Sequence, residues 1–130
     1  MKGEILVIME YSKETLELLL DIIPDYIFYT DLDGRIIYCN ERYAKKIIKK
    51  PKGEIYGKTH EELNLFKESS NIEKIRNNEV IYEKKSLKYT QISYSNGVKY
   101  TIAIEKYPTF DKLGNVSGIL NKIRNISHED

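Results

Sequence analysis

The chain has 130 residues, a length that favours one domain with a single hydrophobic core. Its 21 basic and 20 acidic residues nearly cancel, so no strong net field attracts nucleic acid or an anionic membrane. Cys39 is the single cysteine, which excludes an internal disulfide, and the apolar run Ile5 to Met9 near the start is far too short to span a bilayer. These features predict a cytoplasmic domain with no nucleic-acid partner and no direct membrane insertion.

The first predicted element is an amphipathic helix over about residues 13–23. Ser12 is a favourable N-cap, and apolar side chains follow at helical spacing: Leu16, Leu19, Leu20 and Ile23. Pro24 ends the segment, because a residue before proline is disfavoured in helical geometry. Residues 3–11 continue the apolar character ahead of the cap, and their sequence leaves helix and strand open.

Residues 25–40 predict a β-hairpin followed by helices. Two apolar, aromatic runs flank Asp33-Gly34, which supplies the positive φ of a tight turn. Asn40 then caps a helix to about Lys49, whose apolar stripe is Tyr43, Ala44, Ile47 and Ile48. Residues 54–78 predict several short helical pieces, in which Thr59 and Glu62 have the spacing of a capping box.

From Val80 onward the apolar period changes to two, which predicts strands. Val98, Tyr100, Ile102 and Ile104 form one face of a strand, and Asn96-Gly97 before them is a strong hairpin signal. We expect Ile92 and Tyr94 on the inner face of the preceding strand. Leu87 and Tyr89 have the opposite parity, so either a bulge intervenes or that strand has two apolar faces. A turn at 111–114 leads to a last strand over about 116–126. The order helix, two strands, short helices and three strands indicates the α+β class.

Several segments, in this order and spacing, resemble a PAS domain, the sensory module common in signalling proteins. The match covers about residues 16–127. It rests on Ile23-Pro24-Asp25, on the turn from Thr30 to Arg35, on Asn40, on Glu54 to Thr59, and on Pro108, Asp111, Gly114-Asn115-Val116 and Gly118-Ile119-Leu120. The resemblance implies a five-stranded antiparallel sheet covered on one face by short central helices (the PAS fold), with the N-terminal amphipathic helix outside it.

The same resemblance implies a division of the chain and a role. Residues 1–24 form an N-terminal flanking segment, 25–127 the PAS domain, and 128–130 the start of a linker to an effector. PAS domains are usually not enzymes themselves but input domains, for example of two-component histidine kinases. No nucleophile–base–orienter set is apparent in the sequence, which agrees with that role.

Two functional hypotheses follow from the resemblance. In the first, a small, partly apolar metabolite with at least one polar group binds between sheet and helices and changes the conformation relayed to the effector. In the second, no ligand binds, and the domain forms a homodimer through its N-terminal helix. That helix packs across the outer sheet face or against its copy, with Leu87, Tyr89 and Leu120 as an apolar landing surface.

The residues argue against the prosthetic groups of some PAS domains. The flavin-binding LOV relatives carry a cysteine three residues after the glycine that matches Gly57, and this chain has His60 there; we expect no flavin adduct. Haem-binding relatives use a histidine further along the long helix, and residues 61–78 contain none. His60 and His128 are too few for a metal cluster. The acidic residues 31–33 lack the other positions of a calcium loop and are interpreted as turn residues.

Asn121 is the polar residue of greatest interest, because it shares a face with Ile119 and Ile123. A buried amide is unfavourable by a few kcal/mol unless it is hydrogen-bonded, and the partner is a side chain, a water molecule or a ligand. Strand parity and the geometry of the family together predict the ligand-binding residues, although the tyrosines among them could fill the cavity themselves. These residues are Phe28, Thr30, Tyr43, Ile47, Tyr56, His60, Leu63, Ile92, Tyr94, Tyr100, Ile102, Ile104, Ile119, Asn121 and Ile123.

Overall fold

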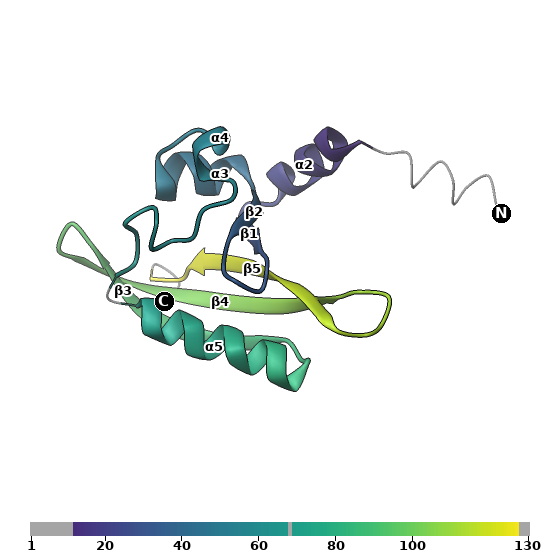
Figure 1. Cartoon of the computed structure of the whole chain (residues 1–130). Helices are drawn as coiled ribbons and strands as arrows, with labels where there is room; N and C mark the ends of the chain where they lie inside the picture. Colours follow the sequence, from purple (N-terminus) through teal and green to yellow (C-terminus); the bar gives the residue numbers. More distant parts are fainter. Residues whose placement is uncertain (1–11, 68, 128–130) are drawn as a thin grey trace.

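The computed structural model describes residues 12–67 and 69–127, so the predictions for residues 3–11 and 128–130 lie outside the described part (Figure 1). Within it, a five-stranded antiparallel sheet has the strand order β2-β1-β5-β4-β3, which confirms the predicted α+β fold class. The strands are β1 (Tyr26–Thr30), β2 (Ile36–Cys39), β3 (Leu87–Ser95), β4 (Val98–Phe110) and β5 (Val116–Asn125). The helices are α2 (Lys13–Ile22), α3 (Glu41–Tyr43), the π-helix η1 (Ala44–Ile48), α4 (Lys52–Ile55) and α5 (Ser70–Glu83).

Helix α2 begins and ends close to the predicted residues. The Ser12 hydroxyl accepts a hydrogen bond from the amide of Thr15 at 3.2 Å, as an N-cap does. The Asp21 carboxylate accepts a hydrogen bond from the Glu41 amide at 2.7 Å, and this contact links the end of α2 to the start of the neighbouring α3 (Figure 1). None of the residues of α2 is buried, so this helix does not pack its apolar stripe across the sheet as one hypothesis expected.

The β1–β2 hairpin forms where the sequence predicts it. Gly34 has φ +81°, and the Asp31 carboxylate accepts hydrogen bonds from the amides of Asp33 and Arg35, each at 2.9 Å. Asn40 then joins strand to helix: its side-chain oxygen accepts from the Tyr43 amide at 3.0 Å, and its Nδ2 donates to the Asp25 carbonyl at 2.8 Å. The hydrophobic core lies against this hairpin and contains Phe28, Ile36, Cys39, Tyr43, Ala44, Ile48, Ile55 and Leu63.

The long helix α5 extends through residues where the sequence predicts a strand. It runs to Glu83, and Val80 is its buried residue, so the predicted change of period at Val80 is wrong. The helix ends at Lys84, which has a left-handed backbone (φ +56°). Short apolar runs do not distinguish a helix end from a strand, and here packing on β4 and β5 decides for the helix.

The predicted inner face of β3 is also wrong. Across the two-residue turn at Asn96-Gly97, Ser95 pairs with Val98, and Ile92 and Tyr94 therefore lie opposite Thr101 and Lys99. Ile92 is 51% exposed and Tyr94 is 64% exposed. In a hairpin with a two-residue turn, the two residues that flank the turn pair with each other and are three apart in sequence. Each further pair lies one residue back on β3 and one residue on along β4. The odd-numbered residues of β3 therefore share a face with the even-numbered residues of β4. Leu87 and Tyr89, which one hypothesis used as an exposed surface, are half-buried, as is Leu120.

Candidate functional site

A cavity of about 60 Å³ lies between α5, the segment 59–69 and one face of the sheet. Its walls combine aliphatic and aromatic side chains with several polar groups. The lining residues are Phe28, Tyr43, His60, Phe66, Ser69, Glu73, Tyr89, Gln91, Ser93, Ile102, Ile104, Lys106 and Ile123. A concave site with a few convergent polar groups has the composition of a small-molecule site.

The structure brings part of the predicted residue set into this lining. Those that line it are Phe28, Tyr43, His60, Ile102, Ile104 and Ile123. Others are placed elsewhere: Thr30, Leu63 and Ile119 are buried, Ile47 and Tyr56 pack against the core, and Tyr100 is half-buried. Ile92 and Tyr94 are on the opposite face and are removed from the candidate site, because the hairpin register turns them outward.

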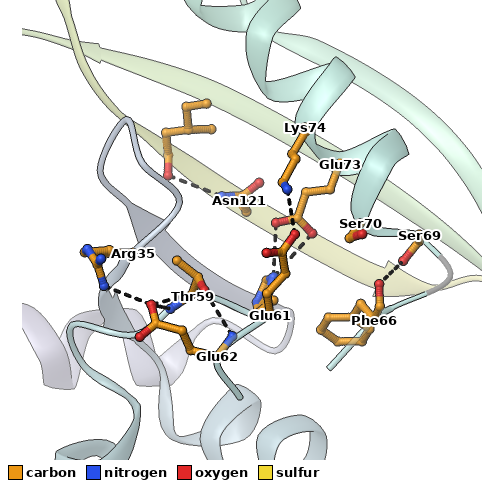
Figure 2. Close-up of polar contacts among 12 residues, drawn as sticks. Arg35, Thr59, Glu61, Glu62, Phe66, Ser69, Ser70, Glu73, Lys74 and Asn121 are labelled. Carbon is orange, nitrogen blue, oxygen red and sulfur yellow. Dashed lines mark hydrogen bonds and ion pairs between the residues drawn. The ribbon is translucent and has the colours of Figure 1, made fainter. Parts of the chain in front are cut away.

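Asn121 is 1% exposed and its partner is a lysine that the sequence analysis missed. The Nζ of Lys106 donates a hydrogen bond to the Asn121 side-chain oxygen at 2.6 Å. The Asn121 amide nitrogen donates to the Ile119 carbonyl at 3.3 Å (Figure 2). Lys106 is itself only 3% exposed and lines the cavity. Asn121 therefore fixes the position of the buried ammonium group of a residue that lines the cavity.

A second buried network joins three elements on the other side of the cavity. The Tyr43 hydroxyl lies 2.8 Å from His60 Nε2, and His60 Nδ1 lies 3.0 Å from a Glu73 carboxylate oxygen. With the proton on Nδ1, His60 donates to Glu73 and accepts from Tyr43, so each group in the chain has a partner. Figure 2 shows Glu73 reaching from α5 toward this network, next to the ion pair between Lys74 and Glu61.

This network has the order of a hydroxyl, a base and an orienting carboxylate, but the hydroxyl is not suited to nucleophilic attack. Tyr43 is 1% exposed, and its ring stacks on Phe28 with centroids 4.7 Å apart. Burial raises the pKa of Tyr43 well above its ordinary value, so the phenol remains protonated. The arrangement is instead a structural link: through His60, hydrogen bonds connect the segment 59–66 to Tyr43 of α3 and to Glu73 of α5.

The cavity walls carry two opposite charges that do not touch. Burial lowers the pKa of Lys106 to about 8, with the charge of Glu73 acting in the opposite direction. For Glu73, burial raises the pKa, but the hydrogen bond from His60 and the charge of Lys106 prevail and lower it. No ion pair within 4.0 Å joins Lys106 to Glu73 in residues 12–67 and 69–127. The two groups therefore create an electric field across the space between them.

Three further wall residues were not predicted from sequence. Tyr89, Gln91 and Ser93 alternate along β3 and face the cavity, and none of their side chains has a hydrogen-bond partner among the described residues. Burial, followed by the charge of Glu73, raises the pKa of Tyr89 to about 12, so its hydroxyl is a donor. The pairing of residues across the two-residue turn would have predicted that Tyr89, Gln91 and Ser93 face the cavity. Continuing the alternation of β4 beyond Ile104 would have predicted the same for Lys106.

A larger groove of about 330 Å³ adjoins the cavity on the side of the β1–β2 turn. The groove and the cavity share His60, Phe66 and Glu73. The Phe66 ring stands edge-on to His60, with centroids 5.0 Å apart, and its backbone has φ +55°, which is uncommon for a bulky residue. Phe66 therefore separates the cavity from the surface groove.

The comparison with known protein families identifies this architecture. A family described as the PAS fold matches residues 20–130. The chain belongs to the PAS fold family. The comparison with curated proteins finds no match.

Solved structures of other PAS domains have the same fold at low sequence identity. The PAS domain of Bordetella pertussis BvgS has a TM-score of 0.75 and 22% identity, covering 88% of this chain and 86% of that one. A structure of VqmA bound to DPO has a TM-score of 0.70 and 22% identity, covering 88% of this chain. This chain spans 57% of the VqmA chain. A sensory box histidine kinase from Vibrio cholerae has a TM-score of 0.68 and 16% identity, covering 98% of each chain.

The expectation of no flavin adduct rests on His60 and Cys39, and the structure places both. His60 is engaged with Tyr43 and Glu73. Cys39 is buried on β2, in the core cluster. Across residues 12–67 and 69–127 no group of three metal-ligating side chains comes together. No helix in that same part of the chain has the length and apolar character needed to cross a membrane.

Proposed function

We propose that this PAS domain is a sensor that binds a small polar molecule in the cavity between α5 and the sheet and relays its occupancy to an attached effector. The observation that carries the proposal is Lys106. An ammonium group has three N–H donors, and only the one given to Asn121 has a partner among the described residues. A buried cation with unused donors is unfavourable unless something in the cavity accepts them, and a ligand with an acceptor atom fulfils that need.

The surrounding contacts support entry and relay. A ligand enters from the surface groove when Phe66 moves, since this ring is the common wall of groove and cavity. At the far end of the sheet, the Ser127 hydroxyl accepts a hydrogen bond from the Thr101 amide at 2.6 Å, and Ile102, the next residue, lines the cavity. A shift of β4 on binding therefore reaches the residues at which the chain leaves the sheet.

The test is a thermal-shift screen of small polar metabolites, followed by native mass spectrometry of each hit. The same hits are measured with Lys106→Met, which keeps the length of the side chain but has no donor. Lys99→Met is the matched control, because Lys99 is exposed on the same strand. We expect stabilised hits with the wild type and Lys99→Met, and their loss with Lys106→Met. No hit with any protein, or equal binding by all three, would refute the sensor proposal.

A second function is favoured by α2, and we propose that this helix mediates self-association. Four large apolar side chains of α2 are each more than half exposed: Leu16, Leu18, Leu19 and Ile22. An exposed apolar patch of this kind is typical of a protein–protein interface. Its self-complementary occupant is the same helix of a second copy, since an isologous dimer places identical surfaces together.

Equilibrium sedimentation tests this second function. Leu19→Glu introduces a charge into the exposed apolar surface of α2 and is expected to leave the protein monomeric at concentrations where the wild type is a dimer. Glu14→Gln is the control on the same helix, because Glu14 is an exposed residue of its first turn. A monomeric wild type, or a dimer that Leu19→Glu does not weaken, would exclude α2 as the interface.

A further inference from the structure

The charges and the size of the cavity specify a class of ligand more narrowly than the sensor proposal does. Lys106 and Glu73 both line the cavity, and each has a hydrogen-bond partner: Asn121 behind the wall for the lysine, and His60, which also lines the cavity, for the glutamate. Because their charges are opposite, the wall as a whole is close to neutral. A ligand with a net charge would therefore enter a partly buried space in which the two wall charges already balance each other, so its own charge would have no counter-charge.

The ammonium of Lys106 and the carboxylate of Glu73 together favour a dipolar ligand, with a hydrogen-bond acceptor at one end and a donor at the other. The ammonium of Lys106 requires an acceptor, and the carboxylate of Glu73 still has lone pairs that accept hydrogen bonds from a donor. Tyr89, Gln91 and Ser93 stand on the same wall with no side-chain partner among the described residues. These three add donors and acceptors that adapt to either end of a dipolar ligand.

The volume limits the size of the part that binds. About 60 Å³ is well below the roughly 150 Å³ of an engineered cavity that holds the six carbons of benzene, so by proportion the space accommodates about two or three non-hydrogen atoms, the size of a carboxamide group. The wall also contains the apolar side chains of Phe28, Ile104 and Ile123, which suit a short hydrocarbon portion of the ligand.

Resting on the proposed sensor function, we infer that the ligand is a small uncharged molecule carrying an acceptor and a donor on neighbouring atoms, as in a primary amide, with the acceptor toward Lys106 and the donor toward Glu73. A longer ligand places this dipolar group in the cavity and the rest beyond Phe66.

The test compares four probes of similar size by NMR titration of the ¹⁵N-labelled protein. Propionamide has both donor and acceptor, butanone has only the acceptor, propionate is an anion and propylammonium is a cation. With the wild type we expect propionamide to shift the amide signals of the cavity-lining strand residues, and to bind at least about tenfold more tightly than either charged probe, because neither has a matching counter-charge. Butanone is expected to bind more weakly than propionamide, because it offers no donor to Glu73.

Two charge-removing variants make the inference specific. Glu73→Gln leaves Lys106 as the uncompensated charge, so the preference is expected to change toward propionate. Lys106→Met leaves Glu73 as the uncompensated charge, so the preference is expected to change toward propylammonium. Each variant is checked by its own NMR spectrum for a folded protein, and because the two predicted changes are opposite, a general loss of structure cannot produce both.

The outcomes separate the two proposals. Tightest binding of propionate or propylammonium by the wild type, or variants that leave the order of the probes unchanged, would overturn the ligand class while hits from the metabolite screen still support a sensor. Binding of none of the four probes would also overturn the ligand class, and if the metabolite screen is empty as well, the sensor function fails with it.

Discussion

The hydrogen bond between Lys106 and Asn121 gives the sharpest prediction about stability. Asn121→Leu removes the observed partner of a buried ammonium group while keeping a side chain of similar size. A hydrogen bond to a charged group contributes about 1.5–3 kcal/mol, and the ammonium left behind is desolvated without compensation. We therefore expect Asn121→Leu to lower the free energy of unfolding by about 3 kcal/mol.

The reverse substitution has a smaller predicted effect. Lys106→Met leaves the Asn121 oxygen unpaired, which is unfavourable by about 1–3 kcal/mol. It also removes the unfavourable burial of the charge, which lowers the pKa of this lysine from 10.5 to about 8 and corresponds to about 3 kcal/mol. These effects oppose each other, so Lys106→Met is expected to be nearly neutral. The double variant, with an apolar pair in place of the polar one, is expected to be at least as stable as the wild type.

Urea unfolding followed by circular dichroism at pH 7 measures all four proteins as a double-mutant cycle. The expected coupling between the two positions is about 3 kcal/mol. Additive effects, or a loss of less than about 1 kcal/mol for Asn121→Leu, would refute the role assigned to this hydrogen bond.

The same lysine predicts an increase of stability with pH. Between pH 8 and 10.5 the unfolded chain binds more protons at Lys106 than the folded protein does, so the free energy of unfolding rises with pH in this range. Relative to Lys106→Met, the wild type is expected to gain about 2–3 kcal/mol between pH 7 and pH 10. A constant difference between the two proteins over this range would contradict the buried, charged state of the lysine.

Three other predictions concern packing and the His60 network. A Cβ on Gly118 would lie 2.6 Å from the Thr30 carbonyl oxygen, so Gly118→Ala is expected to lower stability by at least about 2 kcal/mol. In the matched variant Gly53→Ala nothing lies within 4 Å of the new methyl, and urea unfolding should show no loss. Tyr43→Phe leaves His60 Nε2 without its partner and is expected to lower stability by about 1–2 kcal/mol in the same assay; no change would show that the bond is dispensable. The folded-state pKa of Glu73 is below its ordinary value of 4.5, so its contribution is present above pH 4.5 and is lost as the pH falls through the folded pKa. Acid unfolding of Glu73→Gln should therefore begin from a lower stability and decline less steeply than that of the wild type, and parallel curves would exclude this role.

Local patterns were sufficient to predict most elements of this fold. Ser12, Asn40 and the Thr59–Glu62 pair act through neighbours three residues away, and all three make the predicted hydrogen bonds. The turns at Gly34 and Gly97 likewise depend on backbone conformations that few residues other than glycine adopt readily. Such features are readable from sequence because both partners are close along the chain.

Patterns that depend on register were less reliable. The face assigned to Ile92 and Tyr94 was wrong. A shift of one residue in the register of a strand moves every side chain from the buried face to the exposed face. Asn121 was correctly expected to be buried, but its partner Lys106 was not found, because the alternation of β4 was followed only as far as Ile104 and a lysine is not an expected buried residue.

The sequence by itself determined the α+β class, the caps and turns, the PAS resemblance and the inward direction of Asn121, since these depend on periodicity and on contacts within a few residues. Only the tertiary structure decided that Lys106, Glu73 and Tyr89 line one cavity. They come from β4, α5 and β3, and no local pattern relates them. These three side chains become neighbours only when strand pairing and helix packing bring β3, β4 and α5 together around the cavity.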